Sequence, residues 1–221
     1  MPPQRLAHIV ALANMLKPDI ILLAGDFISD RRLATHNYTY REALAPLAAI
    51  KAPMGALAVL GNHDHWRNGA AARTELTRIG VTVLSNNAAR RGPLAIGGLD
   101  DDFTSHSDLA ATVAAMQQLG GTPVLLSHSP DPFPQVPREV LLMLAGHTHC
   151  GQIRYPWGGT PATMSRYGER YACGRIVEKG HTLIVSAGLG TSVLPFRFFS
   201  RPDMWLITLR PAPAKPSASK S

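Results

Sequence analysis

Short apolar runs that end in polar residues recur along this chain, and they alternate with segments of helical periodicity. The segments 20–26, 55–65, 122–130 and 139–152 each contain an apolar stretch of strand length and then change abruptly to Asp, Asn or His. Strands that alternate with helices indicate an α/β fold built on a sheet. Ligands of such sheets bind beyond the carboxyl ends of the strands, so these polar residues are the first candidates for a functional site.

The remaining segments fit the same plan. Apolar residues at helical spacing in 6–16 predict an amphipathic opening helix. The segment 107–120 is also typical of a helix, with Ser107 as a candidate N-cap and Gly120 at its end. Further helices are predicted at 40–50 and 68–79, and further strands at 81–84, 93–101, 174–190 (as a hairpin) and 203–209.

Length and composition are those of a globular protein. A chain of 221 residues with 45% hydrophobic content fits one domain, which we predict over 1–210. The Pro, Ala, Ser and Lys residues of 211–221 predict a disordered tail. No apolar run is long enough to cross a bilayer, and the N-terminal segment lacks the features of a secretion signal. The chain as given is therefore expected in the cytoplasm.

The charge balance favours anionic partners. There are 22 Lys and Arg residues against 15 Asp and Glu residues, which gives a net charge of +7 and a pI near 9.8. Because no basic block stands out, nucleic-acid binding is not indicated. Cys150 and Cys173 allow one bridge at most, and two reduced thiols are the expected state in a cytosolic chain.

Four predicted strand ends carry residue types that bind metals. These are Asp26, the Asn-His-Asp sequence at 62–64, His128, and the pair His147 and His149. Each alone has a structural explanation as a turn former or as an acceptor of backbone N–H groups. Together they would converge on one cleft, where imidazole, carboxylate and amide groups suit Mn, Fe or Zn. Mixed N and O ligands with room for water indicate a hydrolytic site.

The order of these motifs resembles that of the calcineurin-like metallophosphoesterases. The matching stretches are GD at 25–26, GNHD at 61–64, SHSP at 127–130 and GHTHCGQ at 146–152. AGLGTSVLPFRF, at 187–198, is similar to a bacterial subgroup that includes membrane-associated phosphodiesterases and lipid-precursor pyrophosphatases. The resemblance implies a four-layer α/β/β/α sandwich of two mixed sheets. It also implies metal-dependent hydrolysis of phosphodiester or pyrophosphate bonds.

The resemblance also implies a role for each motif residue. His63 would donate a hydrogen bond or a proton to the leaving-group oxygen, and Asp64 would orient the His63 ring. A hydroxide that bridges two ions would attack phosphorus in line, and the ions would neutralise the phosphate charge. The implied metal ligands are Asp26 as the bridge, Asn62, His128 and His147 on the second ion, and His149 on the first.

One family feature is missing before Asp26. The family normally begins with a strand that ends in Asp-x-His and supplies two ligands of the first ion, whereas this sequence resembles the inside of a longer protein, which would be membrane-associated or exported. The site of the first ion keeps only Asp26 and His149. We therefore expect the second site to bind a metal much more strongly than the first.

Other polar residues rank lower. His65 is a weaker candidate for lining the substrate cleft, and 100–102 is expected to form a turn, with support of the ligands as the alternative. Arg197 and Arg201 are expected to be solvated, with contact to the substrate phosphate as the alternative. The segment 188–192 lacks the Lys of a phosphate loop and is expected to be structural. Cys150 is expected to be a bystander, with metal binding through its thiolate as the alternative. Surface or structural roles are expected for His8, His36, His106 and His181.

Three classes of function remain open at this point. The first is a phosphoesterase, whose phosphate-ester substrate would be lipid-linked and would be met at a membrane surface. The second is a metal-binding or regulatory protein that has lost catalysis with the first metal site. A basic nucleic-acid-binding domain is the third and weakest.

Overall fold

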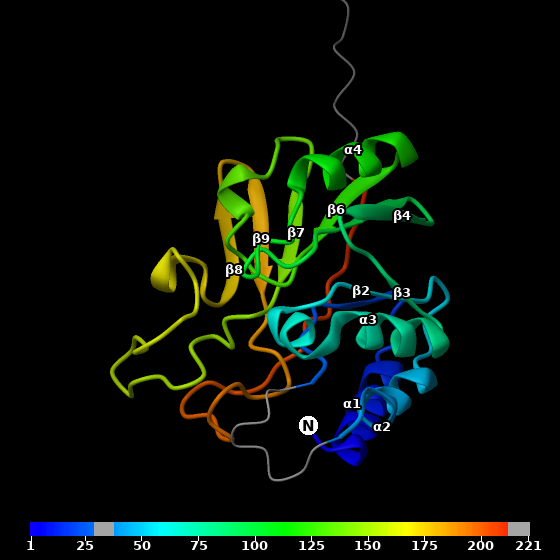
Figure 1. Ribbon diagram of the computed structural model, residues 1–221. Helices are drawn as coiled ribbons and strands as arrows, with labels where there is room; N and C mark the ends of the chain where they lie inside the picture. Colours follow the sequence, from blue (N-terminus) through cyan, green and yellow to red (C-terminus); the bar gives the residue numbers. More distant parts are fainter. Residues whose placement is uncertain (29–37, 212–221) are drawn as a thin grey trace, which may run out of the picture.

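Two β-sheets form the centre of the part described by the computed structural model, residues 1–28 and 38–211 (Figure 1). The smaller sheet has three parallel strands in the order β1-β2-β3, which are Ile21–Leu23, Ala56–Ala58 and Val81–Val83. Helical connections separate these strands, as parallel neighbours require. His36 and residues 212–221 lie outside the described residues, so the predictions made for them stay predictions.

The larger sheet is mixed. Its four central strands are parallel to one another, and its two edge strands are antiparallel to their neighbours. The order is β4 (Asn87–Arg91), β5 (Leu94–Gly98), β6 (Thr122–Leu126), β7 (Leu142–Ala145), β9 (His181–Val185) and β8 (Gly174–Glu178). The predicted hairpin at 174–190 is β8–β9. Strand β4 was not predicted, because Asn-Ala-Ala-Arg-Arg has no apolar alternation.

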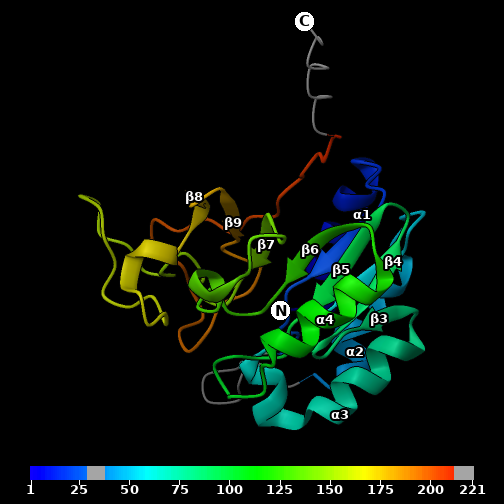
Figure 2. The same cartoon turned by 90° about the horizontal axis from the view of Figure 1, so that it is seen from above.

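Helices cover the outer faces of both sheets, which completes the expected four layers. They are α1 (Pro3–Met15), α2 (Tyr40–Leu44), η1 (Ala45–Ala49), α3 (Asn62–Arg78), α4 (Leu109–Leu119), η2 (Phe133–Gln135) and η3 (Gly168–Tyr171). The first four pack on the smaller sheet, around buried Leu44 and Leu76. Figure 2 shows α4 beside β4 and β5 of the larger sheet, which it contacts. Between the sheets, Leu57, Ile96 and Val124 belong to a core to which both sheets contribute.

Helix α3 begins at Asn62, six residues before the predicted start at 68. The predicted start coincides with a kink, where Asn68 has an extended backbone (φ −177°, ψ 87°). Periodicity detected the regular part beyond the kink and missed the polar first turn. The consequence for the site is direct, because the Asn-His-Asp sequence at 62–64 is the first turn of this helix.

Two further predictions are wrong. The N-cap of α4 is Asp108 rather than Ser107, and its side chain accepts a hydrogen bond from the Ala111 backbone N–H at 2.9 Å. Residues 203–209 belong to neither sheet of the described chain, although their apolar content is typical of a strand. A strand needs a neighbour for its backbone groups, and apolar side chains such as Leu206 are instead exposed.

No helix in the described ranges combines the length and the apolar composition that a membrane span needs.

Candidate metal centre

Four side chains from the ends of β1, β2, β6 and β7 meet at one point. The Nε2 atom of His128 lies 3.1 Å from Asn62 Oδ1, 3.3 Å from Asp26 Oδ2 and 3.1 Å from His147 Nδ1. An ion with tetrahedral ligands at 2.0–2.2 Å places neighbouring ligand atoms about 3.4 Å apart. The spacing of these four groups therefore fits the ligands of a single divalent ion. We call Asp26, Asn62, His128 and His147 the four-residue cluster.

Hydrogen bonds to carbonyl groups orient the two imidazole rings of this cluster. A carbonyl oxygen can only accept, so His128 Nδ1 donates to Ala24 O at 2.6 Å and His147 Nε2 donates to Met164 O at 3.1 Å. The opposite ring nitrogens are then left for the centre of the cluster. Such outer hydrogen bonds commonly fix the tautomer and the ring angle of metal-binding histidines.

The charges within the cluster depend on one another. Burial opposes ionisation of Asp26, but the charge and hydrogen bond of His128 outweigh it and lower the pKa of the carboxyl group. Burial also opposes a charge on His128, yet the Asp26 carboxylate raises the His128 pKa to about 9. For His147, burial and the charge of His128 lower the pKa to about 4. His147 is thus neutral at pH 7, while an ion would have to displace a proton from His128.

The backbone at three predicted ligands is held in the left-handed region. The φ angles are 57° at Asp26, 68° at His147 and 51° at His149. Residues with a Cβ atom rarely adopt this conformation, and it costs about 1–3 kcal/mol each unless the surroundings enforce it. The same conformation occurs at other turns of the described chain, such as those at Lys17 and Asn86, so it does not by itself mark a functional site.

Asp64, which the resemblance predicts to orient the His63 ring, is buried in the first turn of α3. Its carboxylate accepts hydrogen bonds from the backbone N–H groups of Asp26 (2.9 Å), Phe27 (3.0 Å) and Gly61 (3.0 Å). Burial, together with the negative charge of Asp26, raises the Asp64 pKa to about 7. Asp64 therefore ties the loop after β1 to the start of α3 and positions Asp26, which in turn accepts a hydrogen bond from the His63 backbone N–H at 2.9 Å.

Replacing Asp64 with Asn is expected to destabilise the protein by about 1–3 kcal/mol, because the amide NH2 cannot accept a backbone hydrogen bond and leaves buried donors unmet. Thermal unfolding would measure the loss. Asp19→Asn, at an exposed carboxyl group, is the matched control and should leave the melting temperature unchanged. Equal melting temperatures for Asp64→Asn and the wild type would contradict this role.

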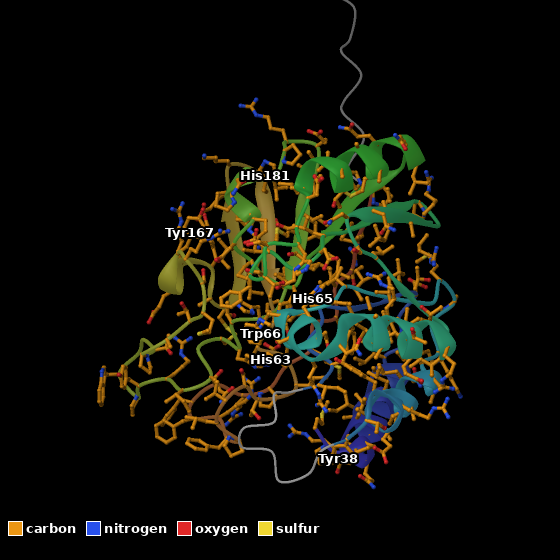
Figure 3. The ribbon with its side chains drawn as sticks, in the orientation of Figure 1. Tyr38, His63, His65, Trp66, Tyr167 and His181 are labelled. Atoms are coloured by element: carbon orange, nitrogen blue, oxygen red, sulfur yellow. A yellow bond between two sulfur atoms is a disulfide. The ribbon has the colours of Figure 1, made fainter. Side chains whose placement is uncertain are left out.

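His63 lies at the start of α3, beside Trp66 (Figure 3). Its Nε2 atom is 3.1 Å from the hydroxyl of Ser192, and the His63 and Trp66 ring centroids are 5.1 Å apart. Sequence reasoning treated 188–192 as structural and so missed Ser192. The short Gly-rich segment carries no signal that the fold returns it to α3.

His149 lies outside the four-residue cluster. In the described chain, the group of carboxylate and imidazole atoms within 4.8 Å of one another comes from Asp26, His128 and His147. The His149 Nδ1 atom instead accepts a hydrogen bond from Arg197 at 3.0 Å. Burial and the charge of Arg197 lower the His149 pKa to about 4.

Arg197 is half-buried, so the expectation of a solvated arginine is wrong. Its guanidinium group also donates to the carbonyl groups of Ala187 and Gly190, both at 2.6 Å. These bonds hold the loop after β9 against His149. These bonds could not be predicted from the sequence, because every residue carries a carbonyl acceptor and only the fold determines which of them meet an arginine.

Cys150 and Cys173 form a disulfide, which corrects the expectation of two reduced thiols. They are 23 residues apart in sequence, but the sheet order β7-β9-β8 brings their Cα atoms to 4.6 Å. The bridge joins the loop that carries His147 and His149 to the residue before β8. A parallel link is the Thr148 hydroxyl, which donates to Ala172 O at 2.6 Å.

A Cys173→Ser variant is expected to lower the free energy of unfolding by about 2–4 kcal/mol, because the unfolded chain loses the constraint of the closed loop. Denaturant titration would measure it, and thiol titration of the unreduced wild type should find no free thiol. If the wild type has two free thiols and the variant is equally stable, the bridge is not part of the folded protein in solution.

Residues 65 and 100–106 form a polar network beside the cluster. His65 Nε2 is 2.8 Å from Asp100 Oδ1, and the His65 ring stacks on His106 with centroids 4.2 Å apart. Asp101 is fully buried, and its carboxylate accepts hydrogen bonds from the Thr104 N–H (2.8 Å) and hydroxyl (2.6 Å). His65 thus braces the loop after β5, in which residues 102–105 form a turn.

Comparison with known proteins agrees with this geometry. The calcineurin-like phosphoesterase family matches residues 3–151. The chain is 32% identical to the uncharacterized metallophosphoesterase YkuE of Bacillus subtilis over 213 residues, covering 93% of this chain and 72% of that protein. It is 29% identical to the phosphodiesterase YaeI of Escherichia coli, covering 95% of this chain and 77% of that protein.

A transmembrane protein with a metallophosphoesterase domain from Danio rerio is 26% identical, and there the chain spans only 49% of the relative. No solved structure gives a significant match. The chain belongs to the calcineurin-like phosphoesterase family, and its class of activity is metal-dependent hydrolysis of phosphoesters.

Proposed function

We propose that the four-residue cluster holds the divalent ion on which phosphoester hydrolysis depends. We also propose that His63 donates a proton to the leaving group. The single observation that carries this proposal is the convergence of three ligand atoms within 3.3 Å of His128 Nε2. Two imidazole nitrogens with a carboxylate and an amide oxygen suit Mn, Fe or Zn. A bound ion would supply Lewis acidity, which lowers the pKa of the attacking water and neutralises phosphate charge.

The chain's own residues have distinct parts in this proposal. Asp26 contributes the negative charge of the cluster, and Asp64 fixes its backbone. His63 Nε2 lies 3.1 Å from the Ser192 hydroxyl, and we propose that this ring donates a proton to the departing oxygen. His149 is proposed as a ligand of a weaker first site, since it first has to leave Arg197.

Removal and return of the ion test this proposal. Hydrolysis of bis(4-nitrophenyl) phosphate is expected to disappear after exhaustive treatment with a chelator and to return when Mn²⁺ is added. Undiminished hydrolysis by metal-free protein would contradict the proposal. Tight Mn²⁺ binding without hydrolysis would favour the alternative of a metal-binding protein without catalysis.

A lipid-linked phosphate ester is the substrate class that we propose within this activity. Two loops, 152–160 and 190–199, lie together, since Arg154 N–H donates to Phe198 O at 2.9 Å and Phe198 N–H to Gln152 O at 3.0 Å (Figure 1). The second loop reaches the site through Ser192 and Arg197. Both loops present exposed apolar side chains, a composition that favours contact with lipid. These are Tyr155, Trp157, Val193, Leu194, Phe196, Phe198 and Phe199.

Co-sedimentation with phospholipid vesicles tests the lipid proposal. The wild type is expected to pellet with vesicles that contain anionic lipid, because the net charge of +7 adds to the apolar contact. A Phe196→Ser, Phe199→Ser double variant should stay largely in the supernatant. If the wild type does not pellet, or if both proteins pellet equally, these loops do not bind lipid.

A further inference from the structure

We propose that Trp66 and Phe103 form the binding surface for the leaving group, and that the favoured substrate is a phosphoester whose leaving alcohol bears an apolar ring. This inference rests on the proposed function, because it places the leaving group beside His63. It adds a specificity surface, which we call the aromatic rim.

The rim connects the two ends of the proposed reaction site. Trp66 comes from α3, and its ring lies 5.1 Å from that of His63 at an interplanar angle of 78°. Phe103 comes from the loop after β5, and its ring lies 4.8 Å from that of His147. The two rim rings are 6.0 Å apart. In the proposed reaction the phosphorus atom lies beside His147 and the leaving group lies on the side of His63. The leaving group therefore lies along the aromatic rim.

Both rings are exposed, and hydrogen bonds hold the backbone segments that carry them. Trp66 is 58% exposed and Phe103 is 42% exposed. Phe103 stands between Asp101 and Thr104, which are joined by two hydrogen bonds, and Trp66 directly follows His65, whose Nε2 atom lies 2.8 Å from Asp100 Oδ1. Large apolar groups presented in this way beside a polar centre mark a ligand-binding surface.

The mutual orientation of the rings favours a flat apolar partner. Trp66 and Phe103 meet at 74°, which forms a corner. A third ring can stack on one wall of such a corner while its edge meets the face of the other. Small hydrophilic alcohols would leave both rings in water and gain nothing from the rim.

Binding of two phosphonates to the Mn²⁺-loaded protein tests the inference without relying on turnover. Phenylphosphonate and methylphosphonate share the anionic head and differ in the ring, and calorimetry gives both affinities. The wild type is expected to prefer phenylphosphonate. Trp66→Ala should weaken phenylphosphonate about tenfold and change methylphosphonate by less than about twofold. Phe103→Ala, on a separate segment, should act in the same direction.

Trp205→Ala is the matched control, because Trp205 is a 43% exposed tryptophan in 203–209, a segment without a role in the proposed site or in the lipid-binding loops. It should leave both affinities unchanged. The role of the aromatic rim would be overturned if the wild type bound the two phosphonates equally, or if the rim variants lost the same affinity for both. Either result would leave the proposed metal site standing. Failure of the wild type to bind either phosphonate would overturn the proposed phosphate site and this inference with it.

Discussion

An Asp26→Ala variant is expected to lose at least about 10³-fold in the rate of Mn²⁺-dependent phosphodiester hydrolysis, because several kcal/mol of charge stabilisation depend on the ion. Asp26 is the carboxylate of the four-residue cluster, and its Oδ2 atom lies 3.3 Å from His128 Nε2. Without it, His128 loses the negative charge that raises its pKa, and the cluster keeps only neutral or positive groups. Such a set of groups binds a cation weakly.

Metal analysis and steady-state kinetics on the same preparations would test this expectation. The variant should contain much less Mn²⁺ after dialysis than the wild type. Asp19→Ala, at an exposed carboxyl group, is the control and should keep both the ion and the rate. An Asp26→Ala protein with wild-type metal content and rate would exclude Asp26 from the site.

A Gly61→Ala variant is expected to fold less stably and to bind Mn²⁺ at least about tenfold more weakly. A Cβ atom at position 61 would lie 2.7 Å from His128 Nδ1 and would also collide with Asp26 Oδ1. Overpacking of this kind costs about 1–3 kcal/mol, and here the groups that must move are two members of the cluster. Gly61 is thus required by the close approach of ligands to the N-terminus of α3.

Thermal unfolding with and without Mn²⁺ would measure both effects of Gly61→Ala. Gly190→Ala is the matched control, because no atom of a neighbouring residue lies within 4 Å of a Cβ placed there. It should preserve the stabilisation that Mn²⁺ confers. If Gly61→Ala gains as much stability from Mn²⁺ as the wild type, the crowding around Gly61 does not govern metal binding.

Much of the fold could be predicted from periodicity. The apolar runs at 20–26 and 122–130 contain β1 and β6, and the spacing in 6–16 predicted α1. Local sequence pattern was insufficient where tertiary contacts decide whether a segment forms a strand. Strand β4 is formed by pairing with β5 despite its polar sequence, whereas 203–209 is apolar and has no strand partner among the described residues.

The candidate site also contains residues that local pattern could predict and contacts that it could not. Asp26, His128 and His147 could be identified because each follows an apolar strand, and parallel strands bring their ends together. Contacts that arise from chain segments far apart could not be read from one sequence. The Arg197 bond to His149 spans 48 residues, and the Ser192 contact with His63 spans 129. The hydrogen bonds of the Asp64 carboxylate could not be predicted either, because their donors are backbone N–H groups, which carry no sequence signal.

We propose that Asp26, Asn62, His128 and His147 together bind one divalent ion. An anomalous difference map from crystals of the Mn²⁺-loaded protein tests it most directly. We expect a peak about 2.0–2.2 Å from both His128 Nε2 and His147 Nδ1, with Asp26 and Asn62 completing the ligands. A fully occupied ion bound elsewhere, with no peak at these two nitrogens, would contradict it.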